Sequence, residues 1–234
     1  RSMYLRGVIT SGEALALASM SVAAGYGEYI LAVTSSHFGS AEKEFRFPLS
    51  YANQRPLSAH WTVTGSGAFL VGKKESHVRI SGLTVGKIVD YGLKDSQNMG
   101  ACMAPAACDT IWQNLQDFGR SPEDYSRIIT GDLGYVGQSI LFDLLLEKGY
   151  DIRGKHLDCG MTIFDQQTQD THAGGSGCGC AATVLSAYIL PKIERGEWER
   201  VLFVPTGALM STVSYNEGAS VPGIAHAIVL EHEA

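Results

Sequence analysis

The chain has 234 residues, of which 45% are hydrophobic and 18% are charged, and its formal net charge at pH 7 is −6. This length and composition predict a globular protein built as one large domain or two fused halves, and the lack of clustered Lys and Arg argues against a nucleic-acid partner. No apolar run approaches the roughly 20 residues of a membrane-spanning helix, and the chain does not start with the layout of a signal peptide, so any membrane association is expected to be peripheral.

The first third of the chain predicts one helix and two strands. Residues 11–24 are mostly apolar and are followed by Gly25, which is typical of a buried helix and its end. Strands are expected at residues 29–34 and 62–71, with a polar loop between them.

The rest of the chain predicts alternating strands and helices, as expected for an α/β fold with a largely parallel sheet covered on both faces. The expected strands lie at residues 78–89, 125–130, 156–159, 200–205 and 224–231, and the expected helices at 100–118, 138–149 and 180–193.

The two parts of the chain are similar to each other. The order helix, strand, loop, strand occurs in both, and GYGEYILAVTSS corresponds to ERGEWERVLFVPTG, which indicates an internal duplication. We therefore divide the chain into a partial N-terminal half, residues 1–77, and a C-terminal half, residues 78–234. The first half shows only the last three elements of the second. The chain is thus expected to begin partway through its first repeat, with an open sheet edge unless a partner covers it.

The run HAGGSGCGCAA, residues 172–182, predicts a ligand-binding turn. Its glycines let the main chain approach a bound group and leave backbone N–H groups bare at the start of a helix, with Gly175, Ser176 and Cys178 as candidate contacts. The alternative is a tight strand-to-helix turn with small buried thiols. The five cysteines are an odd number without paired zinc-knuckle spacing, so we expect free thiols and no metal site.

The loop after the strand at 29–34 is a second candidate binding segment. It contains Ser36, His37 and Arg46, together with several aromatic residues. Guanidinium and aromatic groups together suit a flat, doubly anionic ring. In the alternative interpretation the loop binds no ligand and only covers the core, and Arg46 forms an ion pair with Glu42 or Glu44.

His226 is the polar residue of an otherwise apolar strand, IAHAIVL. A histidine in such a strand is often a hydrogen-bonded core residue. It is also able to donate a hydrogen bond to a carboxylate, which keeps it among the candidate binding residues.

The duplicated halves and the segments AVTSSHFGSAEKEFRFP, WTVTGSGA, ITGDLG, AGGSGCGCAA and IAHAIVLE resemble the thiolase and β-ketoacyl carrier-protein synthase superfamily. Within it they resemble the stage V sporulation protein AD family. The resemblance implies duplicated, thiolase-like α-β-α-β-α layers, with the first half truncated at its N-terminus. It also implies binding of dipicolinic acid, alone or as its calcium chelate, and support of its loading into the developing spore. The implied location is peripheral, at the forespore or spore inner membrane beside other stage V sporulation channel proteins, and a homodimer is implied as well.

The resemblance further implies that the superfamily's catalytic positions are altered in this chain. The cysteine at the start of the first-half helix is replaced by Val8 and Ile9, and the histidine loop after residues 125–130 reads TGDLG. The turn carries Gly177, Cys178 and Gly179 where relatives have an asparagine or a histidine. Without these groups acyl transfer by the usual route is not expected, and the former active pocket is expected to bind a small dicarboxylate only.

Asp132 of the TGDLG segment would repel an anion directly, so it is expected to order the glycine-rich loop or to meet the ligand through bound calcium. Two alternative functions stay open. One is an acyltransferase or ketoacyl synthase that uses Cys178 as a displaced nucleophile, with His226 or His172 as base, and the other is a purely structural partner in a membrane channel assembly. The complete set of expected ligand-binding residues is Thr10, Ser11, Ser36, His37, Arg46, Asp132, Gly175, Ser176, Cys178 and His226, with no catalytic residue, metal or further cofactor.

Overall fold

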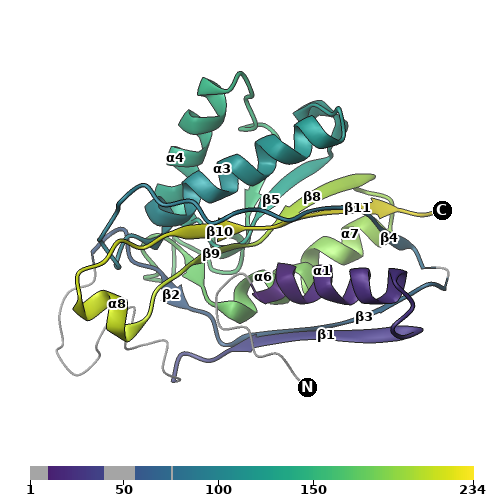
Figure 1. Ribbon diagram of the computed structural model, residues 1–234, viewed down its shortest axis with the longest axis horizontal. Helices are drawn as coiled ribbons and strands as arrows, with labels where there is room; N and C mark the ends of the chain where they lie inside the picture. Colours follow the sequence, from purple (N-terminus) through teal and green to yellow (C-terminus); the bar gives the residue numbers. More distant parts are fainter. Residues whose placement is uncertain (1–9, 40–55, 75) are drawn as a thin grey trace.

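The computed structural model describes residues 10–39, 56–74 and 76–234. These residues form a layered α/β structure, in which a five-stranded sheet lies between two groups of helices (Figure 1). A second, two-stranded sheet lies beyond one of these groups. Within the described residues, no helix is long and apolar enough to cross a membrane.

The five-stranded sheet is mixed rather than largely parallel, so the prediction was wrong in this respect. β11 pairs antiparallel with both β4 and β8, whereas β5 pairs parallel with β8 and β6. β11 is antiparallel to its neighbours because of the connection that leads to it from β8. This connection contains two short strands that pair antiparallel and reverse the chain, whereas a parallel neighbour would need a crossover connection. In sheet order the strands are β4 (Val78–Thr84), β11 (Ala227–His232), β8 (Arg200–Val204), β5 (Arg127–Thr130) and β6 (His156–Asp158).

Helices α3 (Met99–Asp117) and α4 (Gly134–Glu147) cover one face of this sheet. They approach each other at Gly100 and Gly137. A Cβ atom on Gly100 would lie 2.3 Å from the carbonyl oxygen of Leu133 and 2.9 Å from the backbone nitrogen of Gly137. Only glycine therefore allows the two helices to pack this closely.

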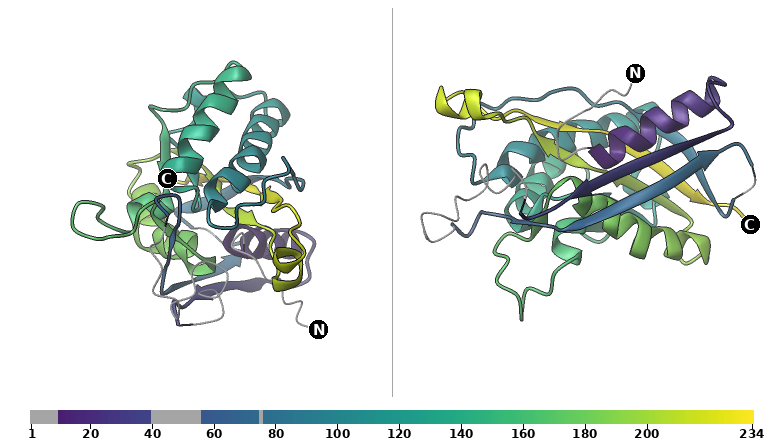
Figure 2. Two further views of the ribbon diagram at one scale, coloured as in Figure 1. Left: turned by 90° about the vertical axis from the view of Figure 1, so that its left-hand side faces the viewer. Right: turned by 90° about the horizontal axis from the view of Figure 1, so that it is seen from below.

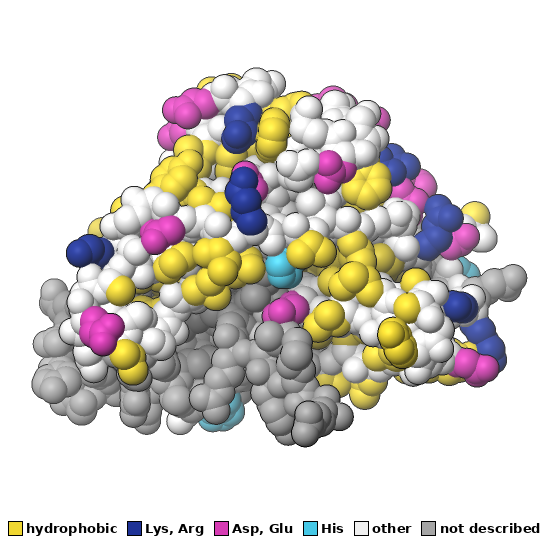
Figure 3. Space-filling model, in the orientation of Figure 1, with side chains coloured by type: hydrophobic (Ala, Val, Ile, Leu, Met, Phe, Trp, Pro, Cys, Tyr) yellow, Lys and Arg dark blue, Asp and Glu magenta, His cyan; other side chains and the backbone are white. Residues whose placement is uncertain are grey.

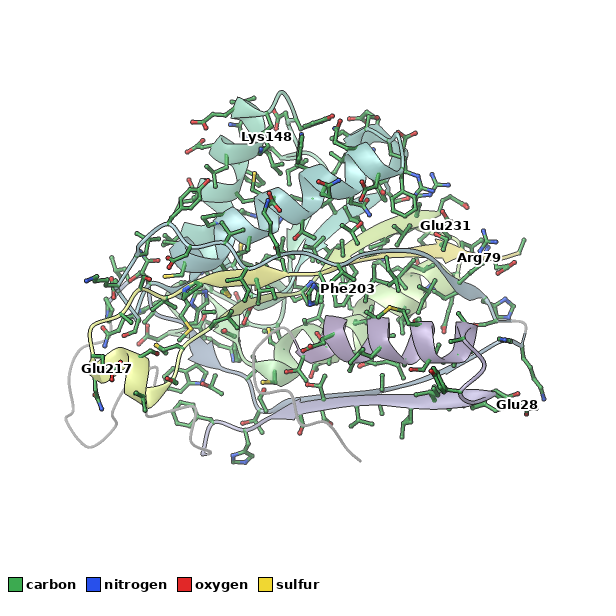
Figure 4. All side chains as sticks on the ribbon, viewed as in Figure 1. Glu28, Arg79, Lys148, Phe203, Glu217 and Glu231 are labelled. Atoms are coloured by element: carbon green, nitrogen blue, oxygen red, sulfur yellow. The ribbon has the colours of Figure 1, made fainter. Side chains whose placement is uncertain are left out.

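The opposite face is covered by α1 (Thr10–Ala23) and by one long helical run (Figure 2). This run consists of α6 (Cys178–Val184), the π-helical turn η3 (Leu185–Ile189) and α7 (Leu190–Glu194). Pro191 explains the wide turn, because it has no N–H to donate and its ring would clash with the carbonyl group four residues earlier. Phe203 of β8 lies in the core between the layers (Figure 4).

The two-stranded sheet consists of β1 (Tyr29–Ser36) and β3 (Gly65–Gly72) in antiparallel register. Its inner face packs on α1 and α6. Its outer face exposes apolar side chains, including Leu31 (60% exposed) and Leu70 (68% exposed). Apolar residues on both faces are typical of strands covered on both sides.

Several predicted elements have different bounds in the structure. The predicted strand at 62–71 is two strands, β2 (Trp61–Thr62) and β3, because Trp61 pairs with Gly175 whereas Gly65 pairs with Ser36. The predicted strand at 224–231 is likewise divided at His226. The first part of that predicted strand is β10 (Gly223–Ala225). The elements that the sequence pattern did not predict are short: η2 (Pro122–Asp124), α5 (Cys159–Thr162), β7 (Gly175–Ser176), β9 (Thr206–Ala208) and α8 (Thr212–Asn216).

Charged and apolar side chains are distributed unevenly over the surface. In Figure 3 hydrophobic side chains gather across the middle of the molecule, and Lys, Arg, Asp and Glu are most frequent toward one end. That end holds the ion pair of Arg79 with Glu231, 2.9 Å long, and the ion pair of Arg200 with Glu231, 2.6 Å long (Figure 4). Arg200 begins β8, so these pairs lie at the opposite end of that strand from Pro205.

Candidate functional site

Three segments that carry predicted site residues meet at Pro205 and Thr206, which connect β8 to β9. The start of α1 packs against this corner, because a Cβ atom on Gly12 would lie 2.8 Å from the ring of Pro205. Thr206 Oγ1 donates a 2.9 Å hydrogen bond to Asp132 Oδ1, and Thr206 pairs with Ala225 in the β9–β10 ladder. The Pro205–Thr206 corner therefore joins α1, the loop after β5 and the strand that precedes His226.

Asp132 is buried at this corner with only 1% of its surface exposed. Its Oδ2 accepts hydrogen bonds from Ser176 Oγ and from the backbone N–H of Gly177, the latter 3.2 Å long. Asp132 thereby holds the glycine-rich turn against the loop after β5. Of the two roles expected for Asp132, this geometry matches the ordering of the glycine loop.

The glycine-rich turn does not present the bare N–H groups that the sequence predicts. Gly177 donates to Asp132, and Gly179 donates a 2.8 Å hydrogen bond to Ser36 Oγ. The prediction fails because buried N–H groups need acceptors, and two distant segments of the chain supply them. Gly175, also in the turn, is buried in β7.

Ser36 and Thr34 fasten β1 to the same turn. Ser36 Oγ donates a 2.7 Å hydrogen bond to the carbonyl oxygen of Val63 while accepting from Gly179, and Thr34 Oγ1 donates to the carbonyl oxygen of Cys178 at 3.1 Å. The structure thus brings Ser36 to the turn that carries Cys178.

His37, in the same loop, is not brought to the corner. His37 is exposed, and its Nδ1 accepts a 2.9 Å hydrogen bond from the nearby backbone N–H of Gly39. Arg46, with its alternative partners Glu42 and Glu44, lies outside the described residues, as do Val8 and Ile9.

Thr10 and Ser11 form the start of α1, next to the corner. Ser11 is 1% exposed, and its hydroxyl has no hydrogen-bond partner among the described residues. A buried hydroxyl without a partner is costly, so Ser11 is suited to a polar group that the described residues do not supply.

His226 lies between β10 and β11 as a nearly buried imidazole. Its Nδ1 accepts a 3.0 Å hydrogen bond from the backbone N–H of Gly86, which leaves the proton of a neutral ring on Nε2. Burial lowers the pKa of His226 below its ordinary value, whereas a hydrogen bond with the backbone of Ala225 opposes this shift. At neutral pH the side chain is therefore a neutral imidazole.

Asp158 supports the whole arrangement and was missed by sequence reasoning. It is the last residue of β6, and its carboxylate accepts hydrogen bonds from Thr130 Oγ1 (2.6 Å) and from the backbone N–H groups of Leu133 (2.9 Å) and Gly134 (3.2 Å). Burial raises the pKa of Asp158, and these hydrogen bonds oppose the rise. Asp158 thus fixes the loop that carries Asp132. Its position at the carboxyl end of a parallel strand was the signal that could have identified it.

His156 lies beneath Asp158 and was also missed. Its Nε2 is 2.9 Å from Thr130 Oγ1 and its Nδ1 is 2.9 Å from Gln138 Nε2. Burial lowers the pKa of His156 to about 4, so the ring is neutral at pH 7.

A small hollow borders the loop that Asp158 holds. It is lined by Ala59, His60, Ser96, Gln97 and Met99, and His60 Nε2 lies 3.2 Å from the carbonyl oxygen of Leu133. Elsewhere, the structured parts of the chain contain no group of three or more His, Cys, Asp or Glu side chains placed to hold a metal ion. Cys178 is half-buried, whereas Cys102, Cys108, Cys159 and Cys180 are buried.

Comparison with known proteins identifies relatives over most of this chain. The family model for stage V sporulation protein AD matches residues 5–231. The stage V sporulation protein AD of Bacillus subtilis (strain 168) is 44% identical over 222 residues, which cover 95% of this chain. The chain spans 65% of the length of that relative.

Solved structures of condensing enzymes are similar in fold. The 3-oxoacyl-[acyl-carrier-protein] synthase III from Aquifex aeolicus VF5 superposes with a TM-score of 0.55 at 14% identity, covering 97% of this chain and 65% of the enzyme. The ishigamide ketosynthase/chain length factor gives a TM-score of 0.59 at 12% identity, covering 98% of this chain and 56% of that structure. At such low identity these similarities establish the thiolase-like fold alone.

Proposed function

This chain belongs to the stage V sporulation protein AD family and has a thiolase-like fold, and from this premise we propose that it binds dipicolinic acid without transforming it. In this proposal it supports calcium-linked uptake of the ligand into the developing spore, as a peripheral protein at the spore membrane beside other stage V sporulation proteins. The observation that carries the proposal is the family match over residues 5–231.

The start of α1 and the buried thiols support binding without acyl transfer. α1 begins at Thr10 in the described residues, and Thr10 and Ser11 place hydroxyl groups rather than a thiol at its start. Burial raises the pKa of Cys102 and of Cys108 to about 11, and burial also raises the pKa of Cys159. These three thiols would stay protonated and unreactive at neutral pH.

The donors at the corner suit a flat ring with two carboxylates. His226 offers the N–H of a neutral imidazole, and Ser11 offers a buried hydroxyl beside the start of a 14-residue helix. In this proposal Arg46 supplies a positive charge. Because the chain carries a net charge of −6, the calcium chelate would be favoured over the free dianion.

Calorimetry of the purified chain with dipicolinate, with and without calcium, tests the proposal. We expect saturable binding that His226→Asn weakens at least about tenfold, an amount equivalent to one lost hydrogen bond to a charged group, because asparagine keeps an acceptor near Nδ1 but has no donor at the position of Nε2. His77→Asn is the matched control, because His77 is exposed ahead of β4. Benzene-1,3-dicarboxylate, which keeps both carboxylates but lacks the ring nitrogen, should bind more weakly in the presence of calcium. No heat from a folded chain at millimolar dipicolinate would refute the proposal.

The two alternative functions give different results. A covalent acyl adduct after exposure to acyl-CoA, detected by intact mass and lost in Cys178→Ala, would favour an acyltransferase. Recruitment to spore membranes without any dipicolinate binding would favour a purely structural partner.

A further inference from the structure

We propose that Asp132 is a built-in ligand of the glycine-rich turn, where its carboxylate fills an anion site formed by Ser176, Gly177 and Thr206. A carboxylate of dipicolinate would then bind elsewhere at the Pro205–Thr206 corner, and this second statement rests on the function proposed above.

The three donors converge on one carboxylate from separate elements. Ser176 belongs to β7, Gly177 precedes α6 and Thr206 begins β9. Ser176 Oγ and the N–H of Gly177 donate to Oδ2 of Asp132, and Thr206 Oγ1 donates to Oδ1 at 2.9 Å. Both oxygens of the carboxylate are therefore held, as they would be for a bound carboxylate ligand.

The donor side chains and the Asp132 carboxylate that they bind are all buried. Ser176 and Thr206 have no exposed surface, and Asp132 has 1%. Without an acceptor, each buried donor would lose its hydrogen bond and bear the full desolvation penalty. The donors thus require an anion or another acceptor, and Asp132 supplies it from 44 residues earlier in the chain.

The backbone explains why the site would accept a small carboxylate if Asp132 were shortened. Gly177 has φ of 123°, a conformation that glycine adopts readily and that directs its N–H toward Asp132. The turn is also held by Ser36, through the N–H of Gly179, independently of Asp132. Removing the Asp132 side chain should therefore leave the donors in place around a cavity that formate can fill.

Chemical rescue tests the proposal without dipicolinate. We expect Asp132→Gly to lower the melting temperature, and sodium formate at about 100 mM to recover at least about 2 °C relative to sodium chloride at equal ionic strength. The wild type and Asp132→Asn should show no such recovery, because their side chains still fill the space. The double variant Asp132→Gly, Ser176→Ala lacks one donor, so its recovery should be smaller.

Three results would overturn the proposal: no recovery by formate, equal recovery in wild type, or equal recovery by the much larger benzoate. If Asp132→Gly is unfolded in sodium chloride, the yield of refolding from denaturant replaces the melting temperature as the measurement. The proposal then expects a higher yield in formate than in chloride, and equal yields would overturn it. The two proposals can fail separately. Rescue by formate does not test the proposed function, and a failure of dipicolinate to bind would not change the interpretation of the rescue.

The statement that dipicolinate binds elsewhere at the Pro205–Thr206 corner is tested separately, by NMR of the wild type. If dipicolinate binds at the corner and leaves Asp132 in place, the amide resonance of Gly177 should keep its hydrogen-bonded chemical shift during the titration while the ring resonances of His226 move. A large change at Gly177 at saturating ligand would show that dipicolinate displaces Asp132, against the proposal.

Discussion

Thr130 and Asp158, directly opposite each other on the parallel strands β5 and β6, are joined by a 2.6 Å hydrogen bond from the threonine hydroxyl to the carboxylate. Because the single hydroxyl proton points to Asp158, the 2.9 Å contact with His156 Nε2 requires the imidazole to be the donor. His156 Nδ1 then accepts from Gln138 Nε2. The hydrogen bonds thus run in one direction from Gln138 of α4 to the carboxylate of Asp158, and they require a neutral histidine. The same carboxylate accepts from the loop that carries Asp132.

This directionality predicts a pH dependence of stability. The pKa of His156 is about 4 in the folded chain and ordinarily 6.5, so between these values the unfolded chain binds more protons. The free energy of unfolding should therefore fall as pH is lowered from 6.5, by about 3 kcal/mol in total, and level off below pH 4. Urea unfolding at several pH values measures this slope. His156→Gln should flatten it and His37→Gln should not, whereas equal slopes in all three proteins would contradict the assignment.

Asp158→Ala should strongly destabilise the chain. The substitution leaves the hydroxyl of Thr130 and the N–H groups of Leu133 and Gly134 without their buried acceptor, with an expected loss of about 3–5 kcal/mol in urea unfolding. Asp165→Ala is the control, because Asp165 is an exposed loop residue that accepts from the nearby N–H of Gln167. A similar small effect of both substitutions would show that Asp158 does not hold the loop.

Gly134→Ala should be far more damaging than Gly149→Ala. Both glycines have positive φ, 63° and 87°, so alanine would cost roughly 1–2 kcal/mol at either position through backbone strain. Only at Gly134 would the new Cβ atom clash, at 2.2 Å from the carbonyl oxygen of Ala173 and 2.6 Å from His60 Nε2. Thermal unfolding of the two variants measures the difference, and equal melting temperatures would contradict this packing.

Cys178 should be the first of the five cysteines to react with iodoacetamide. It is half-buried, whereas the other four are buried. At pH 8 under native conditions, intact mass should show one adduct, and peptide mapping should place it on Cys178. Cys178→Ala should remain unmodified over the same time, and earlier modification of Cys108 would contradict the burial described above.

The long elements could be predicted from sequence because their signals are local. An apolar run that ends in glycine predicted α1 within one residue at each end, and the helix expected at 100–118 is α3, shifted by one residue. The short strands around the corner could not be predicted in this way. β7 and β9 have two and three residues, too few for a hydrophobic period to be recognised.

The candidate site was predicted in part, and the errors have one physical origin. Local sequence indicates where glycine exposes the backbone, but it does not identify the acceptor that the fold brings there. Ser36 lies 143 residues before Gly179, and Asp132 lies 45 residues before Gly177. Asp158 was overlooked because its role depends on donors from the neighbouring strand and the loop after it.

The outer face of the β1–β3 sheet has a practical consequence for work with this chain. Tyr29, Leu31, Val33 and Leu70 are 43–68% exposed, and contact between two such faces would release water at a gain of about 25 cal/mol per Å² of apolar area. Copies of the chain should consequently adhere to one another as the solution is concentrated. The heat of self-association would add to the heat of ligand binding in calorimetry. Each titration should therefore use a protein concentration at which light scattering shows a single particle size.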